Sequence, residues 1–450
     1  MTVRSQIRLT VAALQVLCLM ACGGGGGASH LTPGTYTIGG TVTGLATGQQ
    51  VVLMNSGSDS ITITANGTFT FITRVAASAG YAVTVSTQPT GQNCTVSNGS
   101  ASSVTANVTS VAVACSSMAR YAYVVNNGDN TVSQYTVGTD GSLTPMSTPT
   151  VMSGTSPQSI TVDSTGHYAY VANLNDNTVS QYTITASGAL APNSPATVPT
   201  GTGPSAVTLD SAGQYAYVIN SADNTLSQYT IGSGGALTVM SPATVATGTK
   251  PWSITLDSTG HYAYVANHLD NTVSQYTVGS GGALTPLSPS TVAAGVLPSG
   301  IAVDTMSAYA FVTNLTGGTV SQYSIGTNGV LAAQNPATVA AGGSQPVYIA
   351  VDRTGQYAYV VDYASGNAGE ISQFTIDSIG VLTAMTAPTV PVGKGPTWMA
   401  FNGTGQYAYV TNSSDGTVSQ FAIGPDGSLT PLGTPTVPTG TKPYAIVTVY

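Results

Sequence analysis

A short phrase recurs seven times along this chain, and it constrains the fold more than any other feature. It is close to Tyr-Val-x-Asn-x-x-Asp-Asn-Thr-Val-Ser-Gln-Tyr, and its first five copies are 47 residues apart. The copies begin at Tyr123, Tyr170, Tyr217, Tyr264, Phe311, Tyr359 and Tyr409. A period of about 40–50 residues made of short strands indicates a β-propeller. Since each repeat buries its apolar face only against its neighbours, we expect the copies to close into a ring.

One repeat predicts four strands, which we name A to D from the centre of the ring outward. In the second copy they fall at residues 159–162, 168–172, 178–184 and 197–199, and Pro199 suits an outer edge strand. The first copy begins directly at strand B, near residue 120. The missing strand A is supplied by residues 442–447, which match the start of strand A in the second copy. We therefore predict seven blades, with the C-terminal strand completing the first.

The phrase reads Tyr-Val-Thr-Asn at residues 409–412. It resembles the YVTN-type seven-bladed propellers, which include bacterial surface-layer-like proteins and the lactonase-fold family related to 6-phosphogluconolactonase. The resemblance covers residues 118–450. It implies the fold, and it leaves the activity open because propellers carry many functions.

The first 22 residues have the pattern of a bacterial lipoprotein signal peptide. Arg4 and Arg8 precede an apolar stretch, and residues 19–22 resemble a lipobox ending at Cys22. We expect lipidation of Cys22, export to the outer membrane (cell surface or periplasmic face), and a Gly-rich tether over residues 23–34. An ordinary secretory signal cleaved near Ala21 is the alternative.

Residues 35–116 lack the repeat and alternate apolar and polar residues in short runs, which predicts a small β-sandwich. This segment resembles the Ig-like modules that link a lipid anchor to a propeller, so we interpret it as a stalk. Cys94 and Cys115 are an even pair in an exported chain, and we expect them to form a disulfide.

Charged residues make up 5% of the chain, against roughly 25% in ordinary soluble proteins. The net charge is −8 and no basic stripe is present, which argues against nucleic acid as a partner. We expect no cofactor. The expected partner is a glycan, a small anionic ligand or a protein, and contact with the membrane is expected through the lipid anchor alone.

The strand order places the B–C turns and the D–A loops on one face of the ring, which we call the B–C face. The repeats vary most on this face. Each of the three lysines lies just before a strand A, and large aromatic residues follow. The predicted ligand-binding residues are Lys250, Trp252, Tyr348, Lys394, Trp398, Lys442 and Tyr444. They suit a sugar or an anionic ligand at the mouth of the channel. The alternative is that the tryptophans only plug the channel or pack between blades.

Aspartates recur in the B–C turns, and calcium is one interpretation of them. Each turn offers a single carboxylate, whereas Ca²⁺ takes about 6–8 oxygens, so we expect turn-capping roles and no metal.

The evidence for catalysis is weaker. His268 and Glu370 are the nearest candidates for a lactonase site, whereas Arg353 falls on the opposite face. No catalytic motif of the family can be aligned with the chain. We therefore expect a lipid-anchored propeller that binds a ligand or partner, and leave a lactonase-type hydrolase of an extracytoplasmic lactone as the alternative.

Overall fold

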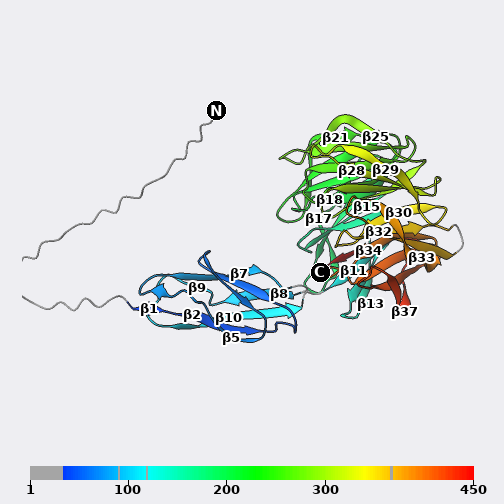
Figure 1. Cartoon of the computed structure of the whole chain (residues 1–450). Coiled ribbons are helices and arrows are strands. Elements are labelled where there is room, and N and C mark those ends of the chain that lie inside the picture. Colours follow the sequence, from blue (N-terminus) through cyan, green and yellow to red (C-terminus); the bar gives the residue numbers. More distant parts are fainter. Residues whose placement is uncertain (1–33, 90–91, 118–119, 365–367, 450) are drawn as a thin grey trace, which may run out of the picture. The chain divides into compact units, whose positions relative to one another are not determined.

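The computed structural model describes residues 34–89, 92–117, 120–364 and 368–449 (Figure 1). Residues 34–89 and 94–115 form one compact unit, and residues 120–449 form the other. All regular structure in these ranges is β-strand. No helix in the described part of the chain could span a membrane. Cys22 and the proposed signal and tether lie outside the described residues, so they stay predictions.

The first unit contains two four-stranded sheets, in the orders β5-β2-β10-β8 and β4-β3-β7-β9, with a short β1-β6 pair beside them. Apolar side chains of both sheets share one core, so the unit is a sandwich. Whether it is Ig-like stays a prediction. The strands are β1 (Thr35–Tyr36), β2 (Ile38–Thr43), β3 (Val51–Asn55), β4 (Asp59–Ile63), β5 (Gly67–Thr70), β6 (Val75–Ala76), β7 (Tyr81–Thr87), β8 (Gln92–Ser97), β9 (Ser100–Ala101) and β10 (Val108–Ser117).

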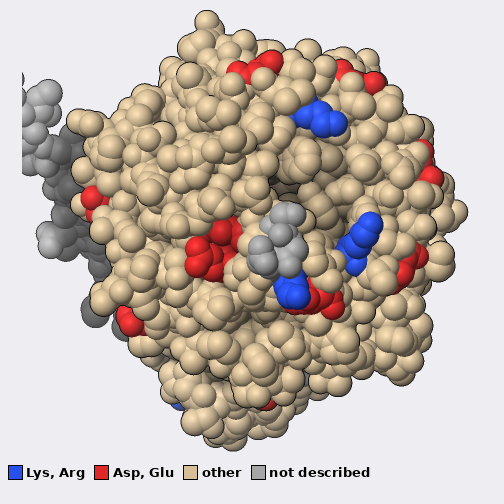
Figure 2. All heavy atoms as spheres, turned by 90° about the vertical axis from the view of Figure 1, so that its right-hand side faces the viewer, with Lys and Arg blue, Asp and Glu red and all other residues tan. Residues whose placement is uncertain are grey.

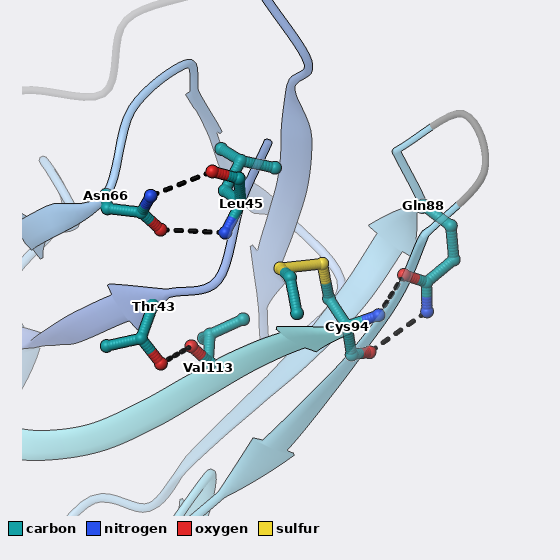
Figure 3. Close-up of a disulfide and its surroundings, with 7 residues drawn as sticks. Thr43, Leu45, Asn66, Gln88, Cys94 and Val113 are labelled. Atoms are coloured by element: carbon teal, nitrogen blue, oxygen red, sulfur yellow. Dashed lines mark hydrogen bonds between the residues drawn. A yellow bond between two sulfur atoms is a disulfide. The ribbon is translucent and has the colours of Figure 1, made fainter. Parts of the chain in front are cut away.

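The expected disulfide joins Cys94 of β8 to Cys115 of β10 (Figure 3). Both cysteines are buried in the sandwich core. The Gln88 side chain accepts a hydrogen bond from the Cys94 backbone N–H at 2.7 Å and donates one to its carbonyl at 3.0 Å. The disulfide and the two hydrogen bonds of Gln88 together hold β8 in place beside β10.

The second unit is the predicted seven-bladed propeller, which confirms the fold. Each blade is an antiparallel sheet of four strands. Strands A are β38 (Pro443–Val449), β14 (Pro157–Val162), β18 (Pro204–Leu209), β22 (Pro251–Leu256), β26 (Pro298–Val303), β30 (Pro346–Val351) and β34 (Pro396–Phe401). Strands B are β11 (Tyr121–Asn126), β15 (Tyr168–Asn173), β19 (Tyr215–Asn220), β23 (Tyr262–Asn267), β27 (Tyr309–Asn314), β31 (Tyr357–Asp362) and β35 (Tyr407–Asn412).

Strands C and D complete the blades on the outside. Strands C are β12 (Thr131–Val137), β16 (Thr178–Ile184), β20 (Thr225–Ile231), β24 (Thr272–Val278), β28 (Thr319–Ile325), β32 (Ala368–Ile376) and β36 (Thr417–Ile423). Strands D are β13 (Leu143–Met152), β17 (Leu190–Pro199), β21 (Leu237–Ala246), β25 (Leu284–Ala293), β29 (Leu331–Ala340), β33 (Leu382–Lys394) and β37 (Leu429–Pro438). Strand B is almost wholly buried in every blade because strands A and C flank it. Strand D is mostly exposed because it is the outer edge strand.

The first blade closes as the sequence predicts. Strand β38 lies antiparallel to β11, with Tyr121 opposite Val449 and Val124 opposite Ile446. Ring closure therefore joins the two ends of the propeller through a ladder of backbone hydrogen bonds.

Two side chains of the repeat bind each blade to the next. The Gln of strand C accepts a hydrogen bond from the first backbone N–H of strand D in the following blade, at 2.6–2.8 Å in all seven blades. In six blades the Tyr of strand B donates its hydroxyl to a glycine carbonyl of the following blade, at 2.6–2.7 Å. These buried bonds explain why the phrase requires Gln and Tyr as well as apolar residues.

Candidate functional site

A cavity of about 900 Å³ opens on the B–C face at the mouth of the central channel. Its wall is made from the first residues of strands A, from B–C turns and from D–A loops. Ser253, Tyr348 and Trp398 line both this cavity and the channel below it. Figure 2 shows a face hollowed near its centre, on which charged side chains are few and scattered. We call this cavity the central pocket.

The aromatic residues predicted from the sequence meet in this pocket. Trp252, Tyr348, Trp398 and Tyr444 all line it, and each comes from the start of a different strand A. Tyr348 and Trp398 stack on each other, with ring centroids 4.2 Å apart. Trp252 stacks on His268 at 5.1 Å. The pocket therefore presents two aromatic pairs, one from the fourth blade and one from the sixth and seventh blades.

The two tryptophans differ in how freely they can meet a ligand. Trp252 is 37% exposed. Trp398 is half-buried and also packs against the apolar cores on both sides of its strand. Trp398 thus packs between blades, which is a structural role that the alternative interpretation gave to both tryptophans. Trp252, in contrast, faces open space.

His268 lies in the B–C turn after β23, and its ring is oriented by the backbone. Its Nδ1 is 3.0 Å from the carbonyl oxygen of Pro298. A carbonyl only accepts, so Nδ1 carries the hydrogen, and in the neutral ring Nε2 keeps a free lone pair. The pocket thus contains a potential proton acceptor.

Two threonine hydroxyl groups of the seventh blade hold the backbone of Tyr444 at the pocket. Thr397 donates a hydrogen bond to the Tyr444 carbonyl at 2.7 Å, and Thr411 donates to the same oxygen at 2.9 Å. Burial, with a smaller contribution from the Tyr363 phenol, raises the pKa of Tyr444 to about 12. Burial also raises the pKa of Tyr348. Both phenols stay neutral at ordinary pH and can offer a hydrogen bond or a ring face to a ligand.

The structure separates the three lysines. Lys442 lines the central pocket, whereas Lys250 and Lys394 are not among the residues of its wall. Lys250 and Lys442 have positive φ (56° and 50°) at the loop position that Gly203 and Gly395 fill in other blades. Lys394 is not in a loop, contrary to the prediction, but ends strand β33. It pairs with Ala368 because β32 is longer than the other strands C.

The two catalytic candidates also lie apart. His268 lines the central pocket, whereas Glu370 lines a smaller cavity of about 350 Å³ in the sixth blade. Arg353 lies in an A–B turn and donates a hydrogen bond from Nε to the carbonyl of Asn402. A role in catalysis or binding stays a prediction for each of these residues.

The aspartates of the B–C turns act differently from the expectation. They do not cap their own turns. The carboxylates accept hydrogen bonds from backbone N–H groups of the D–A loops at 2.5–2.7 Å, as in the pairs Asp176 with Thr155 and Asp415 with Lys394. In these five blades they hold the D–A loop, and hence the start of strand A, against the B–C turn. The described residues contain no group of three or more His, Cys, Asp or Glu side chains able to hold a metal ion.

Sequence reasoning missed several residues of the pocket wall. Asn127, Gln158, Gln345, Tyr363 and Asp415 add amide, phenol and carboxylate groups to it. Their positions follow from the B–C turns, the D–A loops and the strand A starts, which the repeat locates. The repeat therefore gives the place of such residues in every blade. It does not show in which blades their side chains line the pocket.

Three comparisons place the chain among known proteins. The family model for the seven-bladed β-propeller lactonase matches residues 92–197, 120–290, 279–390 and 360–449. No curated protein matches the sequence. Solved structures similar to this chain share its fold at low sequence identity.

A Bacteroides fragilis protein provisionally named 6-phosphogluconolactonase is 18% identical, covering 74% of this chain and 98% of its own, with a TM-score of 0.63. A Pseudomonas aeruginosa periplasmic gluconolactonase is 19% identical, covering 74% of this chain and 99% of its own, with a TM-score of 0.61. These structures support the fold, and the family model extends over most of the chain. The chain therefore belongs to the seven-bladed β-propeller lactonase family.

Proposed function

We propose that the propeller binds a small polyhydroxylated molecule, such as a sugar, an aldonate or a sugar lactone, in the central pocket. The observation that carries this proposal is that both tryptophans of the chain line one cavity of about 900 Å³, each stacked on a second ring. Small-molecule pockets of roughly this volume combine aromatic walls with a few polar groups. The aromatic faces suit the C–H face of a sugar ring, and the Ser, Thr, Asn and Gln side chains suit its hydroxyls.

The charges on the wall favour a ligand with little net charge. Lys442 and Asp415 are its one basic and one acidic side chain among the described residues, apart from the titratable His268. Lys250 and Lys394 are not among the residues of the wall. A multiply charged phosphate ester therefore has less support than a neutral sugar, a lactone or a single carboxylate.

The tryptophans give a direct test. Intrinsic fluorescence should change saturably when a neutral hexose, its aldonate or its aldonolactone is titrated into the protein. Trp252→Ala should weaken the binding by about fivefold, because loss of one ring contact is worth about 1 kcal/mol. Trp398 remains as the reporter in that variant.

Leu269→Ala is the matched control, because Leu269 follows His268 in the same turn, is 57% exposed and does not line the pocket. It should bind like the unmodified chain. If none of the three probes changes the fluorescence, or if Trp252→Ala binds them all equally well, the proposed pocket function is wrong.

Lactone hydrolysis is a second candidate, favoured by membership of the lactonase family and by the free Nε2 of His268 inside the pocket. In this scheme the imidazole takes a proton from a water molecule that attacks the lactone carbonyl. The ring oxygen then leaves as an alkoxide and is protonated to the hydroxyl of the open acid.

Proton release during opening of an aldonolactone measures this activity. His268→Gln should lower the rate by about a hundredfold or more, as expected for loss of a general base. Glu370→Gln should leave the rate unchanged, because Glu370 lies outside the central pocket. If the protein binds the lactone but does not open it faster than the spontaneous rate, it is a binding module and lactone hydrolysis is wrong.

We also propose that the chain is exported and anchored through a lipid on Cys22, as its first 22 residues suggest. A sugar or lactone outside the cytoplasm would then be the accessible ligand. Labelling with a radioactive fatty acid, lost on Cys22→Ser, is the measurement that checks it.

A further inference from the structure

The first residues of strand A differ from blade to blade, and they place aromatic rings in two separate parts of the pocket wall. The second residue of this strand is aromatic in the fourth and first blades, as Trp252 and Tyr444. The third residue is aromatic in the sixth and seventh blades, as Tyr348 and Trp398. In the other blades the third residue is small, namely Ser159, Ala206, Ser253, Gly300 and Ala445. The rings are therefore additions to a wall of small side chains.

The fifth blade separates Trp252 from Tyr348. Its second and third residues of strand A are Ser299 and Gly300, and both line the pocket. The Ser299 hydroxyl donates a hydrogen bond to the carbonyl of Pro346 at 2.9 Å. A Cβ on Gly300 would lie 2.9 Å from the Cα of Tyr348, so the close approach of the two strands excludes a side chain there. At these two positions, the wall between the aromatic groups has only one small hydroxyl and bare backbone.

Each aromatic group keeps a surface that a ligand can reach. Trp252 is 37% exposed, although His268 stacks on one face of its ring. Tyr348 is half-buried, and Trp398 stacks on one side of it. Among the residues that the structure describes, the Tyr348 phenol has no hydrogen-bond partner, and its oxygen is not buried. This phenol can therefore bind a ligand without breaking an existing bond.

Polar groups continue the wall beyond the aromatic residues. The Tyr444 phenol of the first blade and the Gln158 amide of the second also lack a partner among the described residues. Both donate and accept hydrogen bonds, as sugar hydroxyls do. Every blade except the third contributes described residues to the wall. The volume of about 900 Å³ is near the upper end of the range of about 300–1,000 Å³ for small-molecule pockets, so it exceeds what one sugar ring requires.

We propose that the central pocket holds two adjoining sugar units of an oligosaccharide, one against Trp252 and the other against Tyr348. This inference rests on the proposed function, because it divides the same pocket into two subsites. Trp252 is the more exposed ring, so a single sugar binds there. The Tyr348 subsite is filled only by a ligand of at least two units, whose second unit covers the ring and exchanges a hydrogen bond with the phenol.

Calorimetric titration of the protein with glucose, maltose and cellobiose tests the length of the ligand. At least one disaccharide should bind about fivefold more tightly than glucose or better, because a second ring contact is worth about 1 kcal/mol. If neither disaccharide binds more tightly than glucose, the inference is overturned, while binding of glucose alone still supports the proposed function. If no sugar, aldonate or lactone binds, the proposed function and the inference both fail.

The decisive variant is Tyr348→Ala. Alanine is already the third residue of strand A in the first and third blades, as Ala445 and Ala206, so the variant is expected to fold. It should remove the gain of the disaccharide and leave the affinity for glucose within about twofold, because glucose makes no contact with this ring. Trp252→Ala should instead weaken the binding of glucose and of the disaccharide alike. Tyr348→Phe is the matched control, which keeps the ring and should keep most of the gain.

Two results with Tyr348→Ala would contradict the two subsites. If the variant weakens glucose as much as the disaccharide, a single sugar ring is held between both aromatic groups. If the variant keeps the full gain of the disaccharide, the second unit binds elsewhere. Either result would overturn the inference and leave the pocket as the binding site of one sugar unit. The thermal unfolding midpoint of each variant shows whether a loss of affinity reflects a loss of structure.

Discussion

At the scale of single residues, the same position can be compared among the seven copies of the repeat. A position that is Tyr in six copies and Phe in one shows what the hydroxyl contributes, because the surroundings are otherwise the same. Phe311 is that exception: it is fully buried, and the other six residues at its position donate a hydroxyl to a glycine carbonyl of the following blade. The corresponding carbonyl here is that of Gly380, which lies in the turn before strand β33.

Phe311→Tyr should therefore add the missing bond to the carbonyl of Gly380. We expect the free energy of unfolding to rise by about 0.5–1.5 kcal/mol, the usual net value of one intramolecular hydrogen bond. Urea unfolding followed by tryptophan fluorescence measures it, and both tryptophans report on the propeller alone. Tyr264→Phe is the matched control and should lower the same quantity by a similar or larger amount, since it leaves a buried carbonyl unpaired. A destabilised Phe311→Tyr variant would show that the fifth blade has no room for the oxygen.

At the scale of strands and turns, much of the structure could be predicted from the sequence because each element occurs seven times. The strands, the faces of the ring and the closing role of residues 442–447 follow from comparing the copies with one another. The same comparison failed for contacts between elements. The B–C aspartates were expected to cap their own turns, whereas Asp176 binds the Thr155 backbone, which is 21 residues away in the chain. A repeat fixes what each copy contains but not the partner of a side chain in a neighbouring loop.

The candidate site was predictable in part for the same reason. Trp252 and Tyr444 share one repeat position, directly after the first proline of strand A, and Trp398 occupies the next position. Both positions lie at the channel mouth, so the meeting of these rings follows from the ring of blades. Lys250 follows from the repeat as a loop residue, but whether its side chain reaches the pocket depends on local φ and on the neighbouring turn. The acids of the sixth blade were visible as a lengthened turn, yet their pairing needs the strand register, which places Asp362 opposite Glu370.

At the scale of the whole molecule, the propeller depends on closure. Blades contribute cores to one another, and one such core joins residues of strands β38, β11 and β14. Strand β38 also carries Tyr444 into the central pocket, so closure and the candidate site share one segment of the chain. Removing it would expose the inner edge of β11, which is a ready template for aggregation.

A chain that ends at Lys442 should therefore lose the cooperative unfolding of the propeller. We expect destabilisation by more than about 4 kcal/mol, because an entire buried strand is lost and not a single side chain. Circular dichroism, limited proteolysis and binding of a hydrophobic dye measure the effect. A chain that ends at Val449 keeps all of β38 and should behave like the unmodified protein. A synthetic peptide of residues 442–450 should restore protection by adding a strand to the open edge of β11. A truncated chain that unfolds at the same denaturant concentration as the unmodified protein would show that the other six blades hold the ring without the latch.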